Sequence, residues 1–168
     1  MRTVRKRRNE NKTDYKLRIG LLKHDKPRIV VRKTNKYLIA QYVQSQNAKD
    51  KVLIGITSKE LIKHGWPKES LGSLKSIPAA YLTGYILGKK ILNKHKKSES
   101  ILDTGLQRNI HGSRIYALLK GLIDAGIEIP CNEKVFPSED KLNGKNMEKD
   151  ISDLVKKIKN SVKWAKNQ

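Results

Sequence analysis

The sequence predicts an α/β domain whose mixed sheet begins with a three-stranded antiparallel meander. Three observations predict it. Residues 28–57 contain three β-rich runs joined by short polar turns, residues 76–95 and 113–125 have helical patterns that are mostly apolar, and a short apolar run at 99–103 separates the two helices. The order βββαβα is typical of a sheet covered by helices, and 168 residues suffice for one such domain.

The N-terminal residues are expected to be a basic arm followed by a short helix. Residues 1–12 have no apolar periodicity and should be unfolded when free. Thr13 or Asp14 can cap a helix that begins at Tyr15. The helix should end before Pro27, because proline disfavours a helical conformation in the residue before it.

The meander follows this helix. Residues 28–33 and 36–43 are expected to form a hairpin around a polar turn, and residues 51–57 to add a third strand. A short helix at 58–64 and a loop at 65–74 should lead away from the sheet.

Two buried helices are expected next. Ser76 can cap the first, which has Pro78 in its first turn and runs to about His95. The second begins after Ser113 and ends at Gly126, a glycine in the position that closes a helix.

Two short strands and a C-terminal helix complete the chain. Residues 99–103 should form a strand, and residues 127–130 a last strand at the sheet edge. Beyond these, one apolar stripe at helical spacing predicts an amphipathic helix, with Met147, Ile151, Leu154, Val155, Ile158, Val162 and Ala165. The expected organisation is a basic arm at 1–12, a domain at 13–130 and an extension at 131–168.

Positive charge is the strongest compositional signal. The chain has 37 Lys and Arg against 16 Asp and Glu, a formal net charge of +21. Fourteen of these cations and only three of the acids fall in residues 1–36. Self-repulsion of this size opposes compactness unless a polyanion neutralises it, so the charge predicts a nucleic-acid partner.

The remaining composition excludes several classes of protein. An apolar fraction of 37% is enough for a modest core. The single cysteine, Cys131, excludes an internal disulfide framework and fits a reducing compartment. The longest apolar stretch, residues 77–88, is too short for a membrane span, and polar residues follow the basic N-terminus where a secretory leader would be apolar. We therefore expect a soluble intracellular protein.

The basic arm suits phosphate groups for a chemical reason. Arginine presents a planar fork of donors that pairs with two phosphate oxygens, and a disordered arm can follow an irregular groove. Each neutralised phosphate releases counterions, which gives strong and salt-sensitive affinity. An import signal and a solvated tail are the alternatives. The arm's cations are Arg2, Arg5, Lys6, Arg7, Arg8 and Lys12.

Further cations are expected to gather at one end of the first hairpin. Side chains alternate along a strand, so Arg28 and Arg32 should share one face. Phosphate binding is favoured over a merely solvated surface for the set Arg28, Arg32, Lys33, Thr34, Asn35 and Lys36. Tyr37 and Tyr42 could stack on a base, although packing within the protein is favoured for both.

A small anion site is predicted where the second buried helix begins. Gly112, Ser113 and Arg114 present backbone N–H groups, a hydroxyl and a guanidinium in one place. An ordinary serine cap beside an exposed arginine is an equal alternative. Arg108 and His111 in the preceding loop favour contact with RNA.

Catalytic chemistry has little support. The histidines and Cys131 show no metal-ligand spacing, and the expected core strands offer only Asp103 and Glu99 as carboxylates. No phosphate-binding glycine loop or dinucleotide motif is present. We predict no enzymatic activity, cofactor, metal, membrane or small-molecule substrate. The alternatives are an RNA-processing or RNA-modifying enzyme that uses the same basic surface, and a DNA-compacting protein.

Several blocks of residues, in order along the chain, resemble one protein family. The longest is PAAYLTGYILGKK at 78–90, and the others are 15–23, 26–36, 63–66, 101–106, 112–114, 117–121, 124–130 and 135–140. Together they resemble the universal large-subunit ribosomal protein eighteen in its archaeal and eukaryotic form. The resemblance covers roughly residues 10–145.

The resemblance implies a structural protein of the cytoplasmic ribosome. It implies binding to 5S ribosomal RNA at the central protuberance of the large subunit, with contacts to the large-subunit ribosomal RNA and to neighbouring ribosomal proteins, including the other 5S-binding protein. It also implies a three-layer fold of ribonuclease-H-like topology without that enzyme's active site. For the C-terminal helix we expect the stripe to pack on protein and the lysines to face RNA.

The resemblance also extends the list of expected RNA contacts beyond the arm, the hairpin and the helix start. The additional candidates are Tyr15, Lys16, Arg18, Lys23, Lys26 and Gln41.

Overall fold

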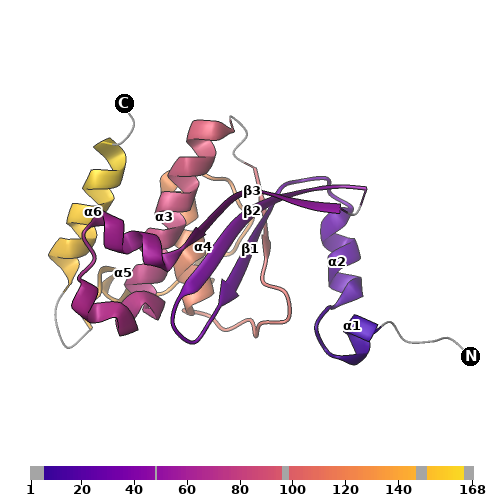
Figure 1. Cartoon of the computed structure of the whole chain (residues 1–168), viewed down its shortest axis with the longest axis horizontal. Coiled ribbons are helices and arrows are strands. Elements are labelled where there is room, and N and C mark those ends of the chain that lie inside the picture. The colour runs from indigo at the N-terminus through magenta and orange to yellow at the C-terminus, as the bar shows by residue number, and fades with distance from the viewer. Residues whose placement is uncertain (1–5, 48, 96–98, 147–150, 165–168) are drawn as a thin grey trace, which may run out of the picture.

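The chain folds around a four-stranded mixed sheet with strand order β3-β2-β1-β4 (Figure 1). The structure, a computed structural model, describes residues 6–47, 49–95, 99–146 and 151–164. The predicted antiparallel meander is confirmed as β1 (Arg28–Lys33), β2 (Leu38–Gln46) and β3 (Lys49–Thr57). Strand β4 (Ile101–Asp103) pairs parallel to β1 and makes the sheet mixed.

Successive side chains of each strand point to opposite faces of the sheet, and this gives the sheet one apolar face and one mixed face. Ile29 and Val31 of β1 are fully buried on the apolar face, where the register places them beside Tyr42 and Ala40 of β2. The opposite face carries polar side chains, among them Arg32.

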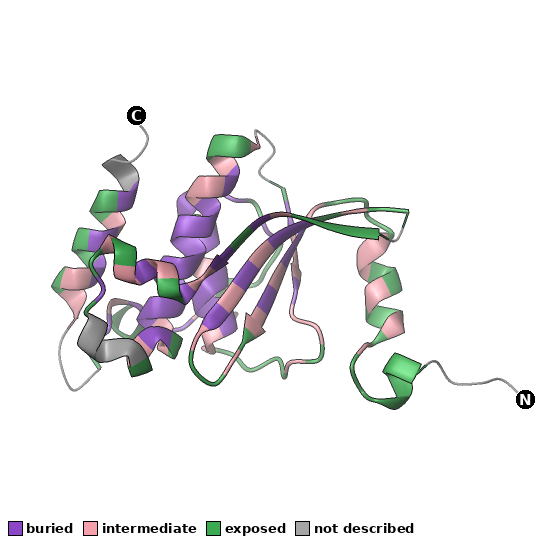
Figure 2. Ribbon diagram, in the orientation of Figure 1, coloured by how far each residue is buried: buried purple, intermediate pink, exposed green. Residues whose placement is uncertain are grey.

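Two helices, α3 (Ile77–Lys94) and α4 (Arg114–Ala125), form the main helical layer over the apolar face (Figure 2). Helix α3 begins as predicted, with the Ser76 hydroxyl accepting a hydrogen bond from the Ala79 N–H. Helix α4 ends at Gly126, whose φ of 108° lies in the left-handed region that favours glycine. Both predicted buried helices are therefore confirmed.

Helices α3 and α4 approach each other so closely that only glycine fits at two facing positions. A Cβ atom at Gly84 would lie 2.0 Å from the carbonyl oxygen of Leu118, and one at Gly121 would lie 2.1 Å from that of Tyr81. The two backbones are therefore in direct contact, and the helix pair behaves as one packed unit.

Several short segments differ from the sequence-based expectation. Strands β2 and β3 continue to Gln46 and Lys49, so the turn between them is much tighter than expected. The expected loop contains a 3-10 helix, η2 (Lys68–Lys75), and the preceding short helix, η1 (Ser58–His64), is also 3-10. The expected edge strand at 127–130 is reduced to a single bridge between Glu128 and Glu99.

The C-terminal region contains η3 (Glu133–Val135), α5 (Glu139–Asn143) and α6 (Ser152–Trp164). The stripe of α6 packs on α3 of its own chain and joins the same hydrophobic core through Val155, Ile158 and Val162.

A polar network also fastens α6. The Lys159 ammonium donates to the Tyr81 hydroxyl over 2.7 Å, and that hydroxyl donates to Asp124 over 2.8 Å. Burial and this carboxylate raise the pKa of Tyr81 above its ordinary value. Met147 and Ala165 of the expected stripe lie outside the described residues.

Candidate nucleic-acid interface

The N-terminal segment lies on the side of the sheet opposite α3 and α4 (Figure 1). Its main element, α2 (Tyr15–Leu22), is capped as predicted, because Asp14 accepts hydrogen bonds from the N–H groups of Lys16 and Leu17. None of the α2 residues is buried (Figure 2). The helix therefore presents Lys16 to solvent, whereas Arg18 is half-buried.

The basic arm is more ordered than expected. Where the sequence predicts no regular structure, one exposed turn of helix, α1 (Lys6–Asn9), is present, and the Arg7 Nε donates to the Thr13 hydroxyl over 2.9 Å. Arg2 and Arg5 lie outside the described residues.

Arg28 corrects the expectation of a single cationic cluster at one end of the hairpin. It lies at the opposite end of β1 from the turn, and only 2% of its surface is exposed. Its guanidinium contacts Asp103 at 2.9 Å, Asp50 at 2.7 Å and the Ser45 hydroxyl at 2.9 Å. Buried charges need such partners. Arg28 therefore ties strands together and is not available to a phosphate.

Asp50 is the acidic centre of this network. Burial alone would raise the pKa of its carboxyl, but hydrogen bonds from Ser45 and Arg28 and the charges of Arg28 and Arg18 outweigh burial and hold that pKa below 3.8. Because Arg18 belongs to α2 and lies 3.1 Å from Asp50 of β3, the ion pair also fastens α2 to the sheet.

The remaining cations predicted to contact RNA fall into two groups. One group is engaged with carboxylates of the same chain. Its pairs are Lys12–Glu10 at 2.8 Å, Arg18–Asp50 at 3.1 Å, Lys26–Glu99 at 2.7 Å and Arg32–Asp103 at 3.6 Å.

The other group has no carboxylate within ion-pair distance among the described residues. Its members come from α1, α2, the first hairpin and the start of α4, and they are Lys6, Arg7, Arg8, Lys16, Lys23, Lys33, Lys36, Arg108 and Arg114. These side chains are the ones whose charge the fold leaves uncompensated.

The turn between β1 and β2 uses one predicted contact residue for its own structure. The Thr34 hydroxyl donates to the carbonyl of Tyr37 and accepts from its N–H, which closes the turn. Asn35 and Lys36 remain exposed. Tyr37 is half-buried beneath the Lys59 ammonium, which lies 4.6 Å from the ring centre.

Two further predictions concern the sheet itself. Tyr42 is buried in the core, as favoured from the sequence. Gln41 is half-buried and pairs with Val30 and Gly55 on the mixed face.

The start of α4 combines a glycine in the left-handed region with an unused hydroxyl. Gly112 has a φ of 68°, and its N–H donates to the Val135 carbonyl. Ser113 occupies the cap position but makes no capping hydrogen bond, and its buried hydroxyl oxygen has no partner in the described part of the chain. His111 is exposed and lies edge-on to Tyr116. The alternative interpretation, an ordinary serine cap, is therefore not observed.

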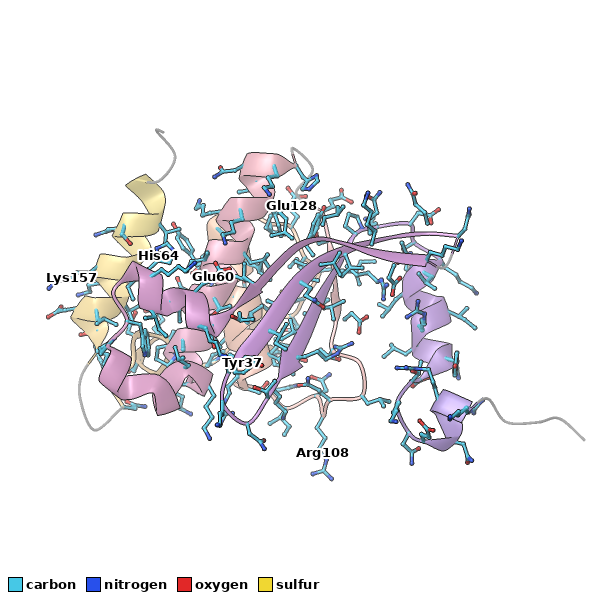
Figure 3. The ribbon with its side chains drawn as sticks, viewed as in Figure 1. Tyr37, Glu60, His64, Arg108, Glu128 and Lys157 are labelled. Carbon is cyan, nitrogen blue, oxygen red and sulfur yellow. The ribbon has the colours of Figure 1, made fainter. Side chains whose placement is uncertain are left out.

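A pocket of about 270 Å³ lies beside this helix start. It is lined by Lys33, Arg108 and Arg114 together with Ser113 and three isoleucines, Ile77, Ile110 and Ile115. Figure 3 shows Arg108 pointing outward from its loop. The sequence reasoning missed the isoleucines, and the only signal for them was Ile110, an isolated apolar residue in a polar loop.

The described residues form neither a metal-ion site nor a membrane-spanning helix. Among residues 6–47, 49–95, 99–146 and 151–164, no three His, Cys, Asp or Glu side chains are close enough to hold a metal ion. Of the helices in these ranges, none has the length and apolar content needed to cross a bilayer.

Comparison with known proteins gives a consistent result. The chain matches the family described as ribosomal large subunit proteins 60S L5 and 50S L18 over residues 1–101 and 94–132. It is 45% identical over 142 residues to the large ribosomal subunit protein uL18 of Korarchaeum cryptofilum, covering 84% of this chain and 70% of that protein. The uL18 protein of Methanosphaera stadtmanae is 45% identical over 142 residues, covering 84% of this chain and 71% of the relative.

A third relative is matched over a longer stretch. The uL18 protein of Methanoregula boonei is 41% identical over 156 residues, covering 91% of this chain and 87% of the relative. All three names describe components of the large ribosomal subunit, and none describes an enzyme. The chain therefore belongs to the uL18 family of large-subunit ribosomal proteins, and it is a structural protein of archaeal type.

Proposed function

We propose that this chain binds 5S ribosomal RNA and anchors it at the central protuberance of the large subunit. The observation that carries the proposal is the division of the cations. The carboxylates of Asp50 and Asp103 on the mixed side of the sheet pair with arginines of the same chain. In contrast, the cations of α1, Lys16 of α2 and the cations of the hairpin turn and of the start of α4 have no carboxylate partner among the described residues. The excess charge is therefore turned outward, where a phosphate backbone can neutralise it.

The proposed mechanism is architectural. The packed sheet and helices hold the hairpin turn and the start of α4 in a fixed relation, while the arm and α2 supply cations on the other side of the sheet. Fixed cations recognise the shape of a folded RNA, because the major groove of an A-form helix is too narrow for side chains to read.

The same proposal includes the finer details of the fold and the partners. Strand order β3-β2-β1-β4, with β4 parallel to β1, supports a ribonuclease-H-like topology. In this proposal the chain also contacts large-subunit ribosomal RNA and neighbouring ribosomal proteins, including the other 5S-binding protein.

The test is a competition experiment at near-physiological salt. Binding of the purified full chain to 5S ribosomal RNA, transfer RNA and duplex DNA is measured, and is repeated for a chain lacking residues 1–12. We expect preference for 5S ribosomal RNA and a shallower dependence of affinity on salt after the deletion, because fewer counterions are then released.

Other outcomes would decide against the proposal. Equal affinity for duplex DNA would favour a DNA-compacting protein, and magnesium-dependent turnover of RNA would favour a processing enzyme. An unchanged salt dependence after the deletion would show that the arm makes no phosphate contacts.

A further inference from the structure

The pocket beside the start of α4 has a cationic half and an apolar half. The cationic half comes from three separate segments: Lys33 ends β1, Arg108 lies in the loop before α4, and Arg114 is the first residue of α4. These residues are far apart in the sequence, so it is the fold that brings them together.

Three cations line this one pocket, and an anion bound there would relieve the repulsion between them. None of them has a carboxylate partner among the described residues, and like charges at close range repel. A second pocket, of about 330 Å³ between α2 and the sheet, gives the contrast, because Asp14 and Asp103 line it together with its arginines. The pocket beside α4 has no acidic residue in its lining.

The start of α4 adds donors to the cationic half. Ser113 does not cap the helix, and its hydroxyl is not used by any described residue. Uncapped N–H groups at the start of a 12-residue helix favour the binding of an anion, as the three cations also do.

The apolar half of the pocket indicates a ligand that has apolar surface as well as a phosphate group. Ile110 is 54% exposed although it lines a cationic pocket, and Ile77 and Ile115 line the same pocket. An inorganic anion would use the cations only. A nucleotide would use both halves, because its phosphate is anionic and its ribose and base have apolar faces.

We infer that this pocket binds one nucleotide of an RNA strand, with the phosphate held by Lys33, Arg108 and Arg114 and the ribose or base packed on Ile110. The inference rests on the proposed function and names the kind of RNA segment that this site takes. Because the pocket has room for about one nucleotide and the base must leave its stack to reach the isoleucine, the segment is a bulge, loop or single strand rather than a regular duplex.

The first test uses the full chain and three small probes: adenosine 5′-monophosphate, inorganic phosphate and adenosine. Nuclear magnetic resonance should show saturable shifts for the nucleotide at the backbone amides of residues 113–117 and at the Ile110 methyl groups. Phosphate should shift the amides only, and adenosine should shift neither strongly. Equal effects of nucleotide and phosphate on Ile110 would overturn the inference.

The second test uses paired variants. Replacing both arginines, Arg108→Gln with Arg114→Gln, should lower affinity for the nucleotide and for 5S ribosomal RNA at least about tenfold, since each arginine makes charge-assisted hydrogen bonds. The matched control, Lys134→Gln with Lys141→Gln, removes the same charge from exposed positions that do not line the pocket and should have a much smaller effect. If the double variant folds poorly, Lys33→Gln tests the same pocket by removing its third cation, and affinity for the nucleotide should again fall.

The two proposals fail separately. If the double arginine variant binds 5S ribosomal RNA as the wild type does, the nucleotide pocket is wrong while the proposed function stands. If the wild type shows no preference for 5S ribosomal RNA, the proposed function is wrong, and the nucleotide titration still decides whether the pocket binds.

Discussion

The guanidinium of Arg28 lies 2.9 Å from the carboxylate of Asp103, and both side chains are at least nine-tenths buried. The two residues are 75 positions apart and sit on neighbouring parallel strands, β1 and β4. Since β4 has only three residues, this ion pair is a main reason why it stays attached to the sheet.

Removing one member of this pair should destabilise the protein strongly. Arg28→Met leaves Asp103 and Asp50 without their shared partner, and breaking a buried pair from one side costs about 3–5 kcal/mol. Urea unfolding at pH 7 should show a loss of about 3 kcal/mol. The control Lys141→Met, at an exposed position, should change stability by no more than about 0.5 kcal/mol. Similar losses in both variants would show that the pair contributes little.

Acid should weaken the same network through Asp50. The pKa of Asp50 is lowered in the folded state, so its contribution to stability is fully present above its unfolded pKa of about 4 and is lost as pH falls through the lower folded value. Unfolding free energy measured between pH 7 and pH 2.5 should therefore fall less steeply below pH 4 in Asp50→Asn than in the wild type. Parallel curves would contradict the assignment.

The close contact of α3 and α4 should make Gly84 intolerant of any side chain. A Cβ atom there meets the Leu118 carbonyl oxygen at 2.0 Å, so Gly84→Ala must push the helices apart and should cost about 3 kcal/mol or more. In the matched control Gly20→Ala, the new methyl group in α2 meets nothing within 4 Å. That change should be neutral or stabilising by up to about 1 kcal/mol. Thermal unfolding of both variants is the measurement.

The C-terminal helix should stabilise the whole domain. Ile158 is buried against the core, so Ile158→Ala should cost about 2–4 kcal/mol of global stability. Lys157→Ala, at an exposed position one residue away, should change stability little. If α6 packed only on another protein, the two variants would have the same stability as isolated chains. Circular dichroism, used to monitor unfolding, measures this stability.

Unpaired cations should contribute more to RNA affinity than paired ones. Lys16→Gln removes a cation without a carboxylate partner, whereas Lys26→Gln removes one that lies 2.7 Å from Glu99. Both variants lose one charge. The slope of log affinity against log salt should decrease by about 0.7–0.9 for Lys16→Gln if it contacts a phosphate, and by clearly less for Lys26→Gln. Equal slopes would mean that internal pairing does not determine which cations bind RNA.

The elements predicted correctly from the sequence are those with local signals. The cap at Ser76, the closing glycine Gly126 and the alternation in residues 28–33 each act over a few residues, and each defines an element in the structure. The 3-10 helix at 68–75 carries no such signal, because it is short and polar.

The candidate site was predicted less well, because the contacts that form it join residues far apart in the sequence. Arg28 was expected to face a phosphate, since neither Asp50 nor Asp103 is near it in the sequence. The amphipathic stripe of α6 was recognised, but nothing local indicates that α3 covers it. The pocket beside α4 likewise depends on Ile77 and Lys33, which only the fold places next to Arg114.

The interlocked glycines of α3 and α4 have a mechanical consequence. They join α3 and α4 into one stiff unit at the centre of the molecule (Figure 1). Neither helix can slide along the other without opening the core, and α6, which packs on α3, moves with them.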